Sequence, residues 1–200
     1  MKHLFYLFLL ITSLVFTGCE DKKETKQTQN ISKHTPKPKP KPIQEYHFDF
    51  FNTKKESLHL LVKNNYYQFG KIKQPIALVN FFATWCPPCR GLMPHLNNLQ
   101  KKYAEKLAIL GILIHDQISN EQIDIFTSAN KIKYFISSNL KANEKFANFI
   151  SPKLKLPDQF NLPLMIMFVE GKYYTHYEGI APEEMIESDI KQALNKIKGS

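Results

Sequence analysis

The sequence predicts an α/β protein built as a three-layer sandwich around one sheet. Apolar runs typical of strands alternate with segments whose apolar residues recur at helical spacing, and the chain ends in a strand, a turn, a strand and a helix. Residues 46–200 suffice for one hydrophobic core, whereas two domains would be cramped. We therefore expect a single domain with a central mixed sheet and an N-terminal β extension.

The first half of the domain carries a buried strand followed by a helix. A strand is expected at residues 57–62, and the apolar run at residues 76–82 is typical of a central strand covered on both faces. A helix should follow Cys89, and Pro94 should kink it. Its buried face is predicted by apolar residues at steps of four, three and four, which are Leu92, Leu96, Leu99 and Tyr103.

The second half alternates further strands and helices. Apolar runs predict strands at residues 107–114, 134–136, 164–169 and 172–177. A capping box at residues 119–122 opens a helix that runs to about Asn130, and a helix at about 142–150 precedes a loop. Pro182 starts a closing helix. Its inward residues are predicted to be Met185 or Ile186, Ile190, Leu194 and Ile197.

The net charge of +9 does not indicate a nucleic-acid-binding protein. Residues 1–45 carry eight lysines and four acidic residues, so the folded part is only mildly basic. Arg90 is the sole arginine, and no zinc-finger spacing or RNA-binding aromatic motif accompanies the lysines. A solvated lysine surface explains the charge, and we expect no nucleic-acid partner.

Residues 1–18 have the form of a secretory signal peptide. A short positive start precedes the apolar run at residues 4–16, which is shorter than the roughly 18 residues that span a bilayer comfortably. Residues 16–19 (FTGC) resemble a bacterial lipobox, although Phe16 replaces the usual leucine. We expect Cys19 to be acylated and to anchor the protein to a membrane. The alternative is a plain signal peptide or an uncleaved anchor, with a free Cys19 thiol.

Residues 19–45 form a Lys- and Pro-rich spacer after the predicted lipidated cysteine. Proline and lysine alternate at residues 36–42, and apolar residues are nearly absent, so this segment cannot pack into a core. Alternating prolines favour an extended polyproline II chain with a rise of about 3.1 Å per residue. The spacer therefore predicts a tether for a domain at residues 46–200, or, in the simpler interpretation, a solubilising segment.

Cys86-Pro87-Pro88-Cys89 joins the buried strand to the start of the predicted helix. A helix N-terminus offers unpaired N–H groups and a positive dipole end, so a Cys86 thiolate is stabilised and its pKa is lowered. Cys89, one turn later, can attack a mixed disulfide formed by Cys86. Pro87 and Pro88 fix the local backbone, and Trp85 would shield one side of the site or pack at its rim. We expect Cys86 to be the nucleophile and Cys89 the resolving cysteine.

This segment resembles a known family. Residues 80–90 (NFFATWCPPCR) look like the active-site segment of the thioredoxin superfamily, in particular of the TlpA/ResA/CcmG group of extracytoplasmic thiol-disulfide oxidoreductases. Residues 162–168 (LPLMIMF) resemble the strand that bears the family's cis-proline. The resemblance implies a thioredoxin fold over most of the domain. It also implies that Pro163 is cis beside the cysteines and that the backbone of Leu162 contacts an extended substrate.

Two residues depart from the family pattern. Leu92 stands where many members have a glutamate, and Asn80 replaces the buried aspartate of cytoplasmic thioredoxins. Neither can accept a proton as a carboxylate does, so these positions are not expected to handle protons in that way. His95 is more simply a helical surface histidine than an acid/base group, and His115-Asp116 is more simply a loop end than a catalytic dyad.

The resemblance implies a membrane-tethered oxidoreductase on the periplasmic or extracytoplasmic side of a bacterial cell envelope. Members of the group commonly reduce the Cys-x-x-Cys-His sites of apocytochrome c during cytochrome c biogenesis, with electrons from a membrane thiol transporter of the DsbD/CcdA type. We therefore expect the protein to reduce disulfides in extracytoplasmic proteins. The chemistry needs no cofactor and no metal.

Three other functions stay open. A disulfide oxidase or isomerase of secreted proteins would use the same two cysteines, and only the redox potential separates it from a reductase. A copper- or zinc-handling protein is disfavoured because one CxxC pair cannot supply a four-ligand zinc site. A redox-inactive adaptor is disfavoured because both Cys86 and Cys89 are present.

Overall fold

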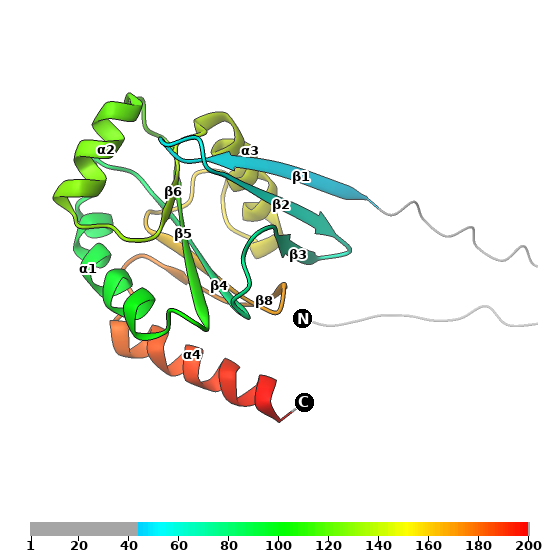
Figure 1. Cartoon of the computed structure of the whole chain (residues 1–200). Coiled ribbons are helices and arrows are strands. Elements are labelled where there is room, and N and C mark those ends of the chain that lie inside the picture. The colour runs from blue at the N-terminus through cyan, green and yellow to red at the C-terminus, as the bar shows by residue number, and fades with distance from the viewer. Residues whose placement is uncertain (1–43, 200) are drawn as a thin grey trace, which may run out of the picture. The chain divides into compact units, whose positions relative to one another are not determined.

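Eight strands form one mixed sheet within residues 44–199, which are the residues that the computed structural model describes. The predicted signal peptide, Cys19 and most of the spacer lie outside the described residues. The strand order is β1-β2-β3-β8-β7-β4-β5-β6 (Figure 1). The strands are β1 (Glu45–Phe51), β2 (Ser57–Lys63), β3 (Tyr66–Phe69), β4 (Ile76–Phe82), β5 (Leu107–Leu113), β6 (Phe135–Ser137), β7 (Leu164–Val169) and β8 (Lys172–Glu178).

Helices cover both faces of the central strands, with α1 and α4 on one side and α3 on the other (Figure 1). The helices are α1 (Pro87–Lys102), α2 (Asn120–Ala129), α3 (Leu140–Ile150) and α4 (Glu183–Lys198), with a short 3-10 helix at Ser151–Leu154. Successive residues of β4 show why: Ile76 and Leu78 pack with α1 and α4, whereas Val79 and Phe81 pack with α3. The expected three-layer α/β sandwich is confirmed.

The N-terminal β extension curls over the face that carries α3. Only one residue pair, Tyr66 with Lys172, joins β3 to β8. The other end of the extension is held near β6, where the Ser138 N–H donates a 2.7 Å hydrogen bond to the Phe51 carbonyl. Phe48 of β1 packs against Phe146 of α3, with ring centroids 5.0 Å apart. The extension is therefore part of the main core rather than an appendage.

Most element boundaries lie within two residues of the predictions, and the expected capping box at Ser119 is present. Ile186 is fully buried and Met185 is exposed, which settles the alternative left open for α4. The loop expected after residue 150 begins instead with the 3-10 helix. Pro94 does not end α1, which continues through it to Lys102 with the proline on the exposed side. Among the described residues, no helix has the length and apolar character needed to cross a bilayer.

Candidate active site

Cys86 and Cys89 lie where β4 passes into α1. Cys86 is the N-cap residue of the helix, and its Sγ accepts a hydrogen bond from the Cys89 N–H at 3.2 Å. The two cysteines form a disulfide. Pro87 and Pro88 occupy the first helical positions, where a missing N–H costs nothing and a fixed φ favours the helix. The sequence thus places both sulfurs at the positive end of a helix dipole.

A hollow of about 660 Å³ opens beside Cys86. Trp85, Pro87 and Pro88 line it from the β4–α1 side, and Leu162 lines it from the segment before β7. Leu162 also packs against the cluster that contains both cysteines. The structure therefore brings these predicted site residues together around one cavity.

The two cysteines differ in access to this hollow. Cys86 is 3% exposed and lines it, whereas Cys89 is fully buried and does not. The Leu162–Pro163 peptide bond is cis, as the resemblance implies. A partner sulfur that enters the hollow would therefore meet Cys86 first.

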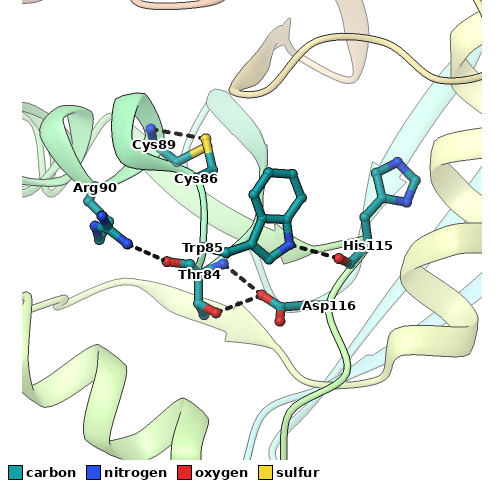
Figure 2. Close-up of a disulfide and its surroundings, with 7 residues drawn as sticks. All are labelled: Thr84, Trp85, Cys86, Cys89, Arg90, His115 and Asp116. Carbon is teal, nitrogen blue, oxygen red and sulfur yellow. Dashed lines mark hydrogen bonds between the residues drawn. A yellow bond between two sulfur atoms is a disulfide. The ribbon is translucent and has the colours of Figure 1, made fainter.

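Two loops meet at this site, and sequence reasoning missed the contact between them (Figure 2). Asp116 Oδ2 accepts hydrogen bonds from the Thr84 N–H at 2.6 Å and from the Thr84 hydroxyl at 2.8 Å. The Trp85 indole N–H donates to the His115 carbonyl at 2.9 Å. One signal could have found the contact, because Asp116 follows a strand parallel to β4, and the carboxyl ends of such strands meet at one edge.

The two histidines considered in the sequence, His95 and His115, lie at different positions relative to the hollow. His95 lies on the exposed side of α1, where its Nδ1 is 2.7 Å from Glu183 Oε2, and it does not line the hollow. His115 does line the hollow, with φ of 53° and its Nδ1 3.2 Å from Glu144 Oε1. The interpretation of residues 115–116 as a plain loop end is therefore incomplete.

No buried carboxylate lies under the cysteines within the described residues. Asn80 and Leu92, which depart from the family pattern, are both fully buried. Neither amide atom of Asn80 has a hydrogen-bond partner, and the Tyr134 hydroxyl is also unpaired. Burial raises the pKa of Tyr134, so its phenol stays protonated at neutral pH.

Metal binding finds no support in residues 44–199. No group of three or more His, Cys, Asp or Glu side chains in this range could hold a metal ion.

Comparison with known proteins supports the fold. The family model described as thioredoxin matches residues 57–135, a segment that includes both cysteines. The segment that carries the cysteines is therefore similar to thioredoxin. The match begins at β2 and ends at the start of β6.

Two curated bacterial relatives are similar to this chain. It is 36% identical over 75 residues to the thioredoxin-like protein YneN of Bacillus subtilis, an alignment that covers 37% of this chain and 44% of YneN. It is 26% identical over 114 residues to the thiol-disulfide oxidoreductase ResA of Bacillus thuringiensis, covering 57% of this chain and 61% of ResA. The chain thus spans less than two thirds of either relative.

Solved structures show the same fold. A thioredoxin family thiol:disulfide interchange protein from Chlorobium tepidum aligns with a TM-score of 0.58 at 20% identity, covering 74% of this chain and 93% of that one. A secreted Mycobacterium tuberculosis disulfide oxidoreductase aligns with a TM-score of 0.51 at 14% identity, covering 72% and 95%. The thioredoxin fold expected from the sequence is confirmed.

The unpaired amide of Asn80 generates a prediction about stability. Asn80→Leu should leave the free energy of unfolding unchanged or raise it, because an apolar side chain of similar size removes two unsatisfied polar atoms. Asn80→Asp should destabilise the protein increasingly as pH rises, because burial raises the pKa of the new carboxyl above its unfolded value of about 3.9. Urea unfolding at pH 4.5 and pH 8 measures both effects.

The expected pH-dependent loss for Asn80→Asp is about 2–4 kcal/mol between those two pH values. The sign follows because the unfolded chain ionises freely above a pH of about 3.9, whereas the buried carboxyl with its raised pKa stays protonated until a higher pH. Equal destabilisation at both pH values, or a clear loss of stability in Asn80→Leu, would show that the Asn80 site is polar and hydrated.

Proposed function

We propose that this protein is a thiol-disulfide oxidoreductase whose Cys86 and Cys89 exchange electrons with the disulfides or thiols of other proteins. One observation carries the proposal: the sulfur at the N-cap of α1 lines an open hollow, while its disulfide partner is buried behind it. This asymmetry gives the two cysteines distinct roles. The match of the thioredoxin model to this segment supports the same chemistry.

The exchange proceeds in two steps from the dithiol form. The Cys86 thiolate attacks a substrate disulfide, so that a mixed disulfide forms and the other substrate sulfur leaves as a thiolate that takes up a proton. The Cys89 thiol then loses its proton and attacks Cys86 Sγ, which re-forms the Cys86–Cys89 disulfide and releases the second substrate thiol. Two electrons pass to the substrate, and a thiol donor must return them.

We favour net reduction of substrates as the physiological direction. The proposed substrates are disulfide-bearing extracytoplasmic proteins, including apocytochrome c, and the proposed electron donor is a membrane thiol transporter of the DsbD/CcdA type. The support is the resemblance of residues 80–90 to the TlpA/ResA/CcmG group and the similarity to ResA. Oxidation or isomerisation of secreted proteins is the competing function of the same site.

We also propose that a lipid on Cys19 tethers the domain in the cell envelope. The support is the sequence of residues 1–45, with a signal peptide, a lipobox-like segment and a Lys- and Pro-rich spacer. A fully extended spacer from residue 20 to residue 45 would reach roughly 80 Å at about 3.1 Å per residue. Such a tether would let one domain meet partners at several heights above the membrane.

The proposed activity predicts that Cys86 is essential. The wild type should accelerate the reduction of insulin by dithiothreitol, and Cys86→Ser should lower the rate to the uncatalysed background. Cys19→Ser is the matched control, because it removes the third cysteine and should keep the wild-type rate. Turbidity of the released insulin chain measures the reaction.

Two results would contradict this assignment. Turnover that survives in Cys86→Ser would exclude the proposed nucleophile. A redox potential near −120 mV in glutathione buffers, about the value of strong oxidants, would reverse the proposed direction and favour an oxidase.

The substrate proposal predicts which proteins are trapped by Cys89→Ser. Without the buried resolving sulfur, the mixed disulfide on Cys86 should persist, so the variant should retain substrates that dithiothreitol releases. We expect apocytochromes with Cys-x-x-Cys-His sites among them, identified by mass spectrometry. The Cys86→Ser, Cys89→Ser double variant controls for non-covalent capture. Trapping of secreted proteins without such sites would favour the oxidase or isomerase.

The tether proposal predicts a change of cell fraction. The full-length wild type should stay with membranes after a high-salt wash, whereas Cys19→Ser should move to the soluble extract, because acyl chains supply about 0.8 kcal/mol per buried methylene. Lys39→Gln is a control that changes the spacer but leaves the lipobox-like segment intact. Membrane retention of Cys19→Ser, measured by immunoblotting, would show that an uncleaved helix rather than a lipid holds the protein.

A further inference from the structure

The β4–α1 loop and the β5–α2 loop are distant in sequence, and three hydrogen bonds join them. We call this contact the loop clamp and define it as the hydrogen bonds that join Thr84 and Trp85 to His115 and Asp116 (Figure 2). We propose that Asp116 is a positioning residue for Cys86, holding the Cys86 thiolate at the N-terminus of α1 whenever the disulfide is open. The inference rests on the proposed thiol exchange and adds a residue to its machinery.

Asp116 holds the backbone two residues before the nucleophile. A single oxygen, Oδ2, accepts both the N–H and the hydroxyl of Thr84, and both side chains are partly buried. Bonds to a carboxylate are roughly twice as strong as those between neutral groups. On the other side, Arg90 Nη1 donates to the Thr84 carbonyl at 3.0 Å. Both backbone groups of Thr84 are thus fixed by charged side chains from different elements.

The second half of the loop clamp is itself anchored. His115, whose carbonyl accepts the Trp85 indole N–H, has a left-handed φ of 53°, which is uncommon for a residue other than glycine. Glu144 of α3 accepts the His115 N–H at 2.6 Å and lies 3.2 Å from the His115 ring. The β5–α2 loop is therefore a fixed support rather than a second moving part.

The importance of the loop clamp depends on the redox state. In the disulfide, a covalent bond ties Cys86 to α1 through Cys89. In the dithiol that bond is gone, while two backbone bonds remain: the Cys86 N–H with the Ala83 carbonyl at 3.3 Å, and the Arg90 N–H with the Cys86 carbonyl at 3.2 Å. The charge-assisted bonds from Asp116 and Arg90 to Thr84 then restrain the segment that leads to the thiolate.

The charge of Asp116 opposes its positioning effect. A carboxylate near the site disfavours a thiolate, whereas the helix N-terminus favours it. The other ionisable groups of the two loops and their anchors are Arg90, His115 and Glu144. Two substitutions separate the opposing effects, because Asp116→Asn keeps an acceptor for the Thr84 N–H without the charge, and Asp116→Ala removes both.

The test measures the reactivity of Cys86 directly. The reduced full chain is alkylated with iodoacetamide from pH 5 to pH 9, and modification of the Cys86 peptide is followed by mass spectrometry, so that Cys19 and Cys89 are counted separately. Asp116→Ala should shift the Cys86 profile to higher pH and slow alkylation at pH 7 about three- to tenfold, the size of a lost helix-terminus interaction. Asp116→Asn should stay within about twofold of the wild type.

A matched control separates positioning from general stability. Asp189→Ala also removes a carboxylate that accepts a hydroxyl, that of Tyr177 at 2.6 Å, but on α4. It should leave the Cys86 profile unchanged. If Asp116→Ala does not fold, Thr84→Val removes only the hydroxyl and should shift the profile in the same direction by a smaller amount.

Three results would overturn the inference. The Cys86 profile of Asp116→Ala could match the wild type, or Asp116→Asn and Asp116→Ala could both shift it to lower pH, which would mean that Asp116 acts through its charge alone. Equal slowing by Asp189→Ala would make the effect one of stability. Alkylation needs no protein substrate, so failure of the proposed oxidoreductase activity would appear separately, in the insulin assay.

Discussion

The parallel pairing of β4 with β5 is the constraint on which the rest of the site depends. The two strands run in register from Ile76 beside Leu107 to Phe82 beside Leu113, so their carboxyl ends finish at the same level. Antiparallel β7 starts beside Phe81 on the other side of β4. Three segments distant in sequence therefore meet at one edge of the sheet: the cysteine loop, the His115–Asp116 loop and the cis-proline segment. The proposed thiol exchange would involve all three.

The features that local sequence patterns determine could be predicted from the sequence alone. Apolar periodicity located the buried faces of α1 and β4, and a CxxC after a buried strand located the sulfurs. The bond from Asp116 to Thr84 could not be predicted in the same way, because it joins residues 32 positions apart whose approach depends on strand register. Pro94 lies on the exposed side of α1, which continues through it to Lys102, and the kink expected there stays a prediction.

The buried residues beneath the two sulfurs differ from those of the family that residues 80–90 resemble. With Asn80 and Leu92 fully buried, the described residues place no carboxylate below the disulfide to accept a proton from Cys89. Protons released during the proposed exchange would then leave by another path, and the hollow beside Cys86 offers one. His115 is a titratable residue that lines this hollow. Proton movement and substrate entry would then share one opening.

The direction of β1 in the N-terminal extension determines where the two ends of that strand lie relative to the cysteine loop. Phe51 ends β1 beside Ser138, at the edge where β6 finishes and the cysteine loop lies, so Glu45 begins β1 at the opposite edge, about 20 Å away for seven extended residues. A partner that reaches Cys86 would therefore approach the domain at the end of β1 opposite Glu45.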